Sequence, residues 1–294
     1  MAIQIATTDS AEDAQRIIVA EAIMWQEQGA PCKNLIQHFK LAKGEKSITI
    51  PFTGKATAVA LTDGVDMADS AAIGFSSTSL TTAEVGVKFI VSDKLVRQAN
   101  DDIFRIVGKQ GGEALARKAD RDIIALFDGF SEASGSTGTN VTMAFFMNCI
   151  TRMEAGYAGT GEPAPTPYAC VLHPYNVAAL RNAAAVAGGT TYPWADGYSQ
   201  DMLRKWLDLV IGDVPIFKDG NIDINATSTA AKGAMFSKSA MAYVESQAPN
   251  VERERDASLR ATEINFVTDY GVFELKDDFG IEMHYYAPTP SIGP

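Results

Sequence analysis

Residues 101–130 read DDIFRIVGKQGGEALARKADRDIIALFDGF, and they carry the most regular pattern of the chain. Apolar and small residues recur every three or four positions along one stripe, which predicts a single long amphipathic helix. At 1.5 Å per residue this helix would span roughly 45 Å, far more than the usual helix of a globular protein. Gly108, Gly111 and Gly112 each cost about 1 kcal/mol relative to alanine, so we expect another element to pack closely against them.

Before this helix the apolar period is two, which is typical of strands. Pro51 restricts the first strand to an edge or an isolated ribbon, because proline donates no hydrogen bond to a neighbouring strand. Residues 62–82 are rich in Asp, Gly, Ser, Thr and Ala and bury little surface, so we expect them to project from the body. The strands are predicted at residues 48–52, 57–61 and 85–91. A short helix is predicted at residues 93–99.

The rest of the chain mixes helix and strand patterns, and the predicted fold class is therefore α+β. Near the N-terminus, residues 10–25 predict an amphipathic helix that ends at Gly29 and Pro31 and forms an early arm. Ser134–Thr139 is a Gly/Ser/Thr segment and is the strongest candidate for a linker between domains. Further helices are predicted at 143–157, 176–182 and 199–209, strands at 168–172, 214–217, 240–245, 264–267, 272–275 and 281–286, and a turn at 269–271.

Composition and charge exclude several classes of function. The chain has 294 residues, a hydrophobic fraction of 46% and a formal net charge of −11. This acidic balance lacks the basic surplus that binds phosphate backbones, so sequence-specific nucleic-acid binding is not expected. The three cysteines are widely spaced and the N-terminal residues show no export signal, so we expect a soluble protein of a reducing cytosol.

The motifs of enzymes and metal sites are missing from the sequence. There is no phosphate-binding loop, no G-x-S-x-G elbow and no H-E-x-x-H pair. His38, His173 and His284 each stand without a Cys, His or carboxylate at ligand spacing. We therefore predict no catalytic residue, no metal ligand and no cofactor. One alternative of another class remains open, a hydrolase with an atypical site around His173 and Asp213.

The order of these elements resembles the tailed-phage major capsid proteins of the Hong Kong 97 type, over nearly the whole chain. SITIP at residues 47–51 is similar to the start of the extended hairpin of that family, the E-loop, and LTDGVD at 61–66 to its descending side. VKFIVSDKL at 87–95 is similar to the strand that leads into the spine helix of the family, here residues 101–130. VLHP at 171–174 and IGDVPI at 211–216 are similar to strands of the axial domain of the family, and TDYGV at 268–272 resembles the closing strands of its peripheral domain.

The resemblance implies a non-enzymatic subunit that assembles as hexamers and pentamers into an icosahedral shell around double-stranded DNA. It implies a virion location after assembly in the host cytoplasm, and a scaffolding protein, a portal and a decoration protein as partners. An encapsulin-like shell around a protein cargo is the alternative with the same fold. The expected divisions are an N-terminal arm at 1–45, an E-loop at 46–85, a peripheral domain at 86–135 and 240–294, and an axial domain at 136–239. The assembly contacts that we expect are Trp25, Ile50, Phe52, Lys55, Asp63 and Asp66.

Overall fold

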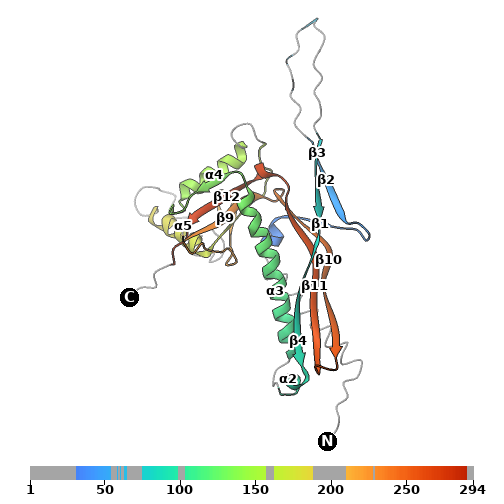
Figure 1. Cartoon of the computed structure of the whole chain (residues 1–294). Helices are drawn as coiled ribbons and strands as arrows, with labels where there is room; N and C mark the ends of the chain where they lie inside the picture. Colours follow the sequence, from blue (N-terminus) through green and yellow to red (C-terminus); the bar gives the residue numbers. More distant parts are fainter. Residues whose placement is uncertain are drawn as a thin grey trace, which may run out of the picture.

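The computed structural model describes residues 31–53, 58, 60, 63–64, 75–98, 103–156, 162–187, 210–227 and 229–289. Within these residues the chain is a mixed α+β structure with a four-stranded sheet, a six-stranded sheet and a two-stranded hairpin (Figure 1). The predicted N-terminal helix at 10–25 and the predicted helix at 199–209 lie outside the described residues. The α+β class is confirmed.

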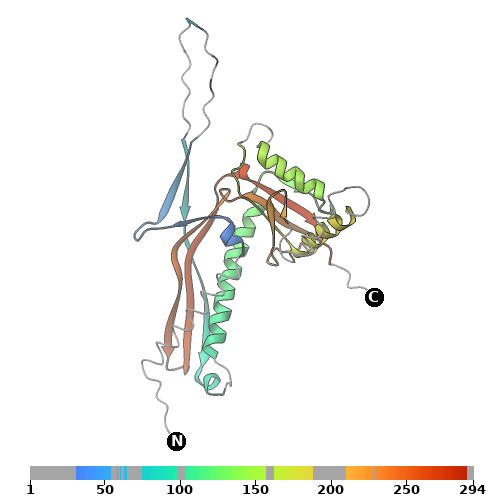
Figure 2. The ribbon, with the colours of Figure 1, turned by 180° about the vertical axis from the view of Figure 1, so that it is seen from behind.

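The four-stranded sheet is long and narrow, and its strands follow the order β1-β10-β11-β4. β10 pairs antiparallel with β11, β11 pairs antiparallel with β4, and β1 runs parallel to the first part of β10. Figure 2 shows that this sheet is elongated and that its end away from the hairpin lies beside α2 (Asp93–Gln98). The strands span Gln37–Lys40 for β1, Ala83–Ser92 for β4, Met241–Asp256 for β10 and Ala261–Glu274 for β11.

The long helix predicted from the sequence packs along this sheet. It is α3 (Ile103–Ala125), and the chain then tightens into the 3₁₀ helix η2 (Leu126–Gly129). The predicted span of 101–130 is therefore too long, because the last turn is 3₁₀ and Phe130 is extended and buried. The expected close packing on the helix glycines is confirmed at Gly111, where an added Cβ would lie 2.7 Å from the ring of Phe266.

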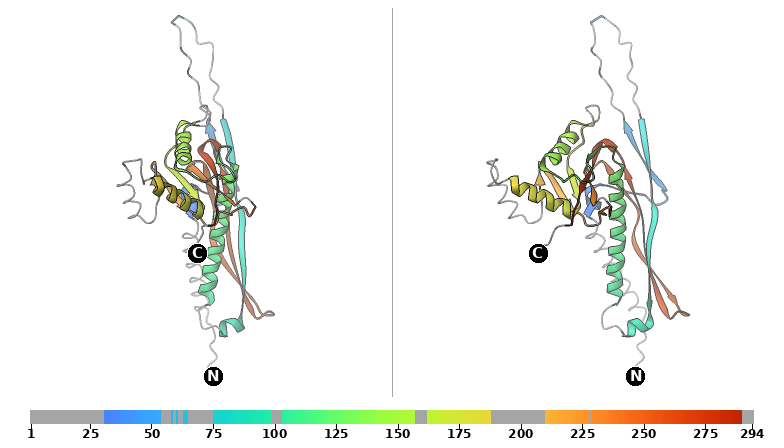
Figure 3. Two further views of the ribbon diagram at one scale, coloured as in Figure 1. Left: turned by 90° about the vertical axis from the view of Figure 1, so that its left-hand side faces the viewer. Right: turned by 60° about the vertical axis from the view of Figure 1, so that its left-hand side comes forward.

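The six-stranded sheet is separate from the long sheet, and its strands follow the order β5-β12-β9-β6-β8-β7. Helices α4 (Met143–Ala155) and α5 (Pro174–Ala187) lie beside it (Figure 3). Phe146, Ile150 and Met153 of α4 are buried in its core, as the apolar stripe of this segment predicts. The strands span Ala133–Gly135, Gly280–Tyr286, Ala230–Ser237, Tyr168–Leu172, Val214–Lys218 and Val210–Ile211, in sheet order.

The hairpin consists of β2 (Ser47–Thr53) and β3 (Phe75–Thr81), which pair with each other and with no other described strand. The expectation that Pro51 belongs to a ribbon or an edge is confirmed, since Pro51 lies opposite Ser77 in this two-stranded sheet. Figure 1 shows the hairpin pointing away from both larger sheets. The strand predicted at 57–61 falls almost wholly outside the described residues.

Two sequence predictions of irregular structure are wrong. The turn predicted at 269–271 lies inside β11, where Gly271 is needed because an added Cβ would lie 2.3 Å from the carbonyl oxygen of Thr81. Ser134–Thr139 is not a free linker over its whole length, because Ala133–Gly135 is strand β5 and pairs in parallel with β12. Gly135 has a φ of +87°, a conformation that favours glycine.

Candidate functional site

The projecting hairpin carries the most exposed large apolar side chain of the described residues. Phe75 is 73% exposed at the start of β3, and it lies opposite Thr53 in the strand register. At the other end of β3, Leu80 is fully buried in a cluster that includes Leu41 and Val244. The hairpin is therefore anchored at its base on the long sheet while its outer part presents Phe75 to solvent.

The predicted assembly residues are placed only in part. Ile50 and Phe52 are half-buried on β2, and Ile50 packs against the Leu80 cluster of its own chain. Asp63 is exposed in a turn beside Gly64. Trp25, Lys55 and Asp66 lie outside the described residues. The described ones do not form one cluster, and Phe75 was missed although it is a lone aromatic residue in a Ser/Thr-rich stretch.

The far end of the long sheet forms a second exposed apolar area. Leu95 and Val96 of α2 are 47% and 40% exposed, and Leu259 in the turn between β10 and β11 is 58% exposed. Arg255 joins the two elements by donating two hydrogen bonds to the carboxylate of Asp93, at 2.5 and 2.7 Å. This pairing lowers the pKa of Asp93, and its hydrogen bonds are the largest cause.

Asp256 orders the turn itself. Its carboxylate accepts hydrogen bonds from the main-chain N–H groups of Ser258 and Leu259, at 2.8 and 3.1 Å. The Ser258 hydroxyl also donates to it, at 2.7 Å, and these bonds lower the pKa of Asp256. These hydrogen bonds stabilise the turn in which Leu259 is exposed.

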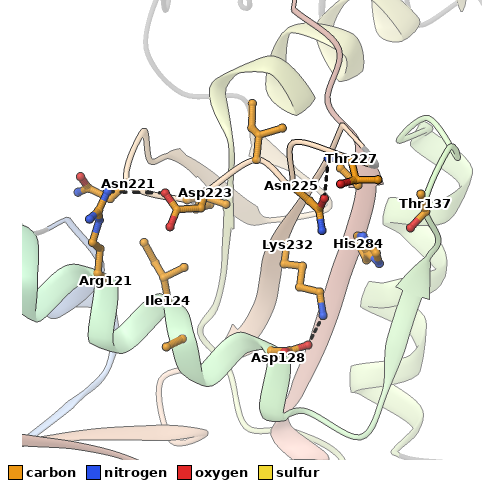
Figure 4. A pocket seen from close by; sticks show the side chains of 14 residues that line it. Arg121, Ile124, Asp128, Thr137, Asn221, Asp223, Asn225, Thr227, Lys232 and His284 are labelled. Carbon is orange, nitrogen blue, oxygen red and sulfur yellow. Dashed lines mark hydrogen bonds and ion pairs between the residues drawn. The ribbon is translucent and has the colours of Figure 1, made fainter.

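An open cavity of about 730 Å³ lies between the end of α3 and the loop that follows β8. Figure 4 shows Lys232 reaching Asp128 and Arg121 pointing toward Asp223. Each of these cations is thus paired with a carboxylate, and Lys232 is also 3.0 Å from a carboxylate oxygen of Glu282. A balanced site of this kind offers no surplus positive charge to a phosphate or a nucleic acid. Its other polar lining residues are Thr137, Asn221, Asn225, Thr227 and His284.

A cluster of buried polar side chains lies next to this cavity. Cys32 and Asp120 are fully buried and Asp219 is 3% exposed. The Cys32 Sγ and one carboxyl oxygen from each aspartate lie within 4.8 Å of one another, a spacing that a metal ion could bridge. Hydrogen bonds already join these groups, and burial raises the pKa of the Cys32 thiol, so they form a closed polar cluster. Sequence analysis missed it because its members are far apart in the chain.

The alternative hydrolase site gains no support from the geometry. His173 is buried, and its Nδ1 accepts a hydrogen bond from the main-chain N–H of Tyr175 at 3.1 Å. Burial lowers the pKa of His173, and the charge of Asp219 partly opposes this shift. Asp213 lies in the turn between β7 and β8 with a φ of +63°. Within the described residues, no hydrogen bond joins the two side chains.

Comparison with known proteins identifies the fold. No protein-family model matches the sequence, and no curated protein does. Among solved structures, the head of Helicobacter pylori bacteriophage KHP40 is similar with a TM-score of 0.65 and 12% identity, over 86% of this chain and 87% of that chain. The capsid of a native GTA particle has a TM-score of 0.65 and 11% identity, over 91% of each chain. A virus-like particle from Pyrococcus furiosus has a TM-score of 0.58 and 10% identity, over 91% of this chain and 98% of that one.

These similarities define a fold that is found in phage heads, in capsids and in a virus-like particle. More particularly, the chain has the fold of the major capsid proteins of tailed bacteriophages. Its main features in the described residues are the separate two-stranded hairpin, the long four-stranded sheet and the helix α3 along that sheet. In the described part of the chain, no helix has both the length and the apolar character to cross a bilayer.

Proposed function

We propose that the chain is a major capsid protein whose copies assemble as hexamers and pentamers into an icosahedral shell around double-stranded DNA. The observation that carries this proposal is the hairpin of β2 and β3. It forms a separate two-stranded sheet, and only its base is buried against the rest of the chain. A two-stranded hairpin is marginally stable alone, so it gains stability by lying on a partner. Phe75, at 73% exposed, is the side chain that a neighbouring copy would cover.

The proposal assigns a role to each part of the chain. Residues 1–45 would be an arm in which residues 32–41 dock on α3 and beside β10 of their own subunit. Residues 46–85 would be the E-loop and reach over a neighbouring subunit. Residues 86–135 and 240–294 would form the peripheral domain around α3, and 136–239 the axial domain near the centre of each capsomer. Strands β5 and β12 of the first set pair within the six-stranded sheet and would therefore join the two domains. The exposed Leu95, Val96 and Leu259 at the end of the long sheet would then meet other copies.

The charge of the chain is consistent with a shell that encloses DNA without binding it tightly. The net charge is −11, and the lysine and arginine of the open cavity are paired with carboxylates. Such a wall would enclose DNA without binding a particular sequence. A scaffolding protein, a portal and a decoration protein are the partners that we propose with it, and the shell would be the capsid of a virion that assembles in the host cytoplasm.

The second candidate function is an encapsulin-like nanocompartment, a shell that encloses a protein cargo. The specific observation in its favour is the likeness to the Pyrococcus furiosus virus-like particle, of which 98% of the chain is covered. Both functions use the same fold, so the enclosed material distinguishes them.

Negative-stain microscopy and light scattering of the purified protein test the proposal. We expect closed icosahedral particles or capsomer rings, formed by the chain alone or with its scaffolding partner. Nuclease-protected DNA in particles isolated from producing cells would favour the phage capsid, and a defined protein cargo would favour the nanocompartment. A monomer that stays monodisperse under all these conditions would contradict both.

A further inference from the structure

Two buried carboxyl groups face each other where α3 passes the segment after β8. Asp120 belongs to α3 and Asp219 directly follows β8, and their exposed fractions are 0% and 3%. Their carboxyl groups lie within the cluster whose donor atoms are all within 4.8 Å of one another. Ionised carboxylates are strongly disfavoured in such a place, so two adjacent ones need either a cation or a proton.

The groups that donate hydrogen bonds to this pair are neutral. Cys32 N–H donates to Asp120 Oδ1 at 3.2 Å, and Asn221 Nδ2 donates to Asp120 Oδ2 at 2.9 Å. Asn221 N–H donates to Asp219 Oδ1 at 2.8 Å, and the Cys32 thiol donates to Asp219 Oδ2 at 3.3 Å. These bonds satisfy the oxygens but bring no positive charge.

The charged groups on the neighbouring elements are engaged elsewhere. Arg121, next to Asp120 on α3, lies 3.6 Å from Asp223 and is half exposed. Lys33, next to Cys32, lies 3.8 Å from Glu245 and stands over the ring of Tyr243. Lys218, next to Asp219, is exposed. Burial lowers the pKa of His173, and Asp122 binds Lys118 and Tyr270. A proton is therefore the compensation that the described residues supply.

We propose that Asp120 and Asp219 share one proton, and that this proton holds residues 31–36 against α3. Cys32 bridges the pair, since its N–H bonds one carboxyl and its thiol bonds the other. An increase in the separation of the two carboxyls would therefore strain the bonds from Cys32. Cys32 and Ile36 are also fully buried beside Ala119 and Ile123 of α3, so the segment is docked through this contact.

The direction of the pH dependence follows from the environment of Asp120. Burial, and then the carboxyl–carboxyl hydrogen bond with Asp219, raises the pKa of Asp120 to about 7. The folded protein thus keeps a proton that the unfolded chain loses near its ordinary pKa of 3.8. The resulting stabilisation is complete below the unfolded value and is lost as the pH rises through about 7. Because it belongs to a single folded chain, this device does not depend on the proposed assembly.

Hydrogen exchange of the unassembled full-length chain tests the proposal, with the protection factor of the amides of residues 32–36 measured between about pH 5 and about pH 9. In the wild type we expect this protection to fall about tenfold or more as the pH rises from about 5 to about 7, and to level off at higher pH. Asp120→Asn should remove the pH dependence, because its amide does not titrate and can donate to Asp219 as the protonated carboxyl does. It loses the oxygen that accepts from Asn221, so the test is the flat pH profile and not the absolute level of protection. Asp128→Asn, whose carboxylate binds Lys232 at the surface, is the matched control and should behave like the wild type.

A second measurement keeps the test decisive if Asp120→Asn folds poorly. The infrared spectrum of the wild type should contain the C=O band of a buried protonated carboxyl at mildly acidic pH, and this band should disappear above about pH 7. Absence of the band, or equal protection of the segment across the range, would overturn the shared proton. So would protection that is removed by a chelator and restored by Zn²⁺, because a metal ion would then hold the pair.

Discussion

The ring of Phe266 lies where a side chain on Gly111 would have to be, since an added Cβ would come within 2.7 Å of it. Gly111 is in the middle of α3 and Phe266 is in β11, so this contact sets how closely the helix approaches the long sheet. Phe266 is 1% exposed and packs edge-on against Phe89 of β4. The ring therefore has little room to move aside.

Gly111→Ala should destabilise the protein although alanine is the better helix former. The substitution gains about 1 kcal/mol of helix propensity, but overpacking of a filled core costs about 1–3 kcal/mol and here meets an aromatic ring. Because the buried ring has little room to move, we expect the upper part of that cost, about 2–3 kcal/mol, and hence a net loss of about 1–2 kcal/mol in the free energy of unfolding, measured by denaturant titration. Gly220→Ala is the control, because an added Cβ there meets nothing within 4 Å. A variant at Gly111 as stable as the wild type would contradict the packing argument.

The three cysteines should be unreactive in the folded protein. Cys32, Cys149 and Cys170 are all buried, and burial raises the pKa of each thiol. Because the thiolate is the reactive form, we expect no labelling by iodoacetamide at neutral pH in the native state. The same reagent should label all three thiols in denaturant. Fast labelling of any of them in the native protein would mean that its surroundings open readily.

The long helix and the hairpin strand at 48–52 could be predicted because their apolar residues recur with a clear period, and several strands of the six-stranded sheet could be predicted from short apolar runs. Residues 168–172 are predicted and observed as the same strand, and the strand at 281–286 differs by one residue. Where both faces are polar this signal fails. β10 was expected to end at Glu245 but continues to Asp256 through alternating Glu and Arg residues, which pair with β11 through the backbone.

The candidate site was less predictable, because contacts distant in sequence create it. Cys32 and Asp120 are 88 residues apart, and Cys32 and Asp219 are 187 apart. No short sequence motif predicts such a cluster, because each of its residues, taken alone, is typical of an ordinary surface or core position. Phe75 had a weak signal, since an aromatic residue in a polar projecting segment has no core of its own to enter.

Arg255→Ala should weaken the far end of the long sheet in a way that depends on pH. Its hydrogen bonds lower the pKa of Asp93, so the stabilisation is present above the ordinary value of 3.8 and is lost as the pH falls through the lowered one. We expect the variant to show faster hydrogen exchange in residues 93–98 than the wild type at neutral pH, and the two to converge in strong acid. Lys94→Ala removes a neighbouring charge without this pair and is the control. A difference that persists unchanged into acid would contradict the ion-pair argument.

Phe75→Ser should separate assembly from folding. The side chain is 73% exposed, so its loss should change the free energy of unfolding of the unassembled chain by no more than about 0.5 kcal/mol. Burying an aromatic ring against a partner stabilises an interface by about 2 kcal/mol or more, and each shell repeats that contact in every copy. We therefore expect the critical concentration for assembly, measured by light scattering, to rise at least about tenfold. Ser76→Ala, the next residue on the same strand, is the matched control and should assemble like the wild type. Normal assembly of Phe75→Ser would show that another part of the hairpin makes the contact.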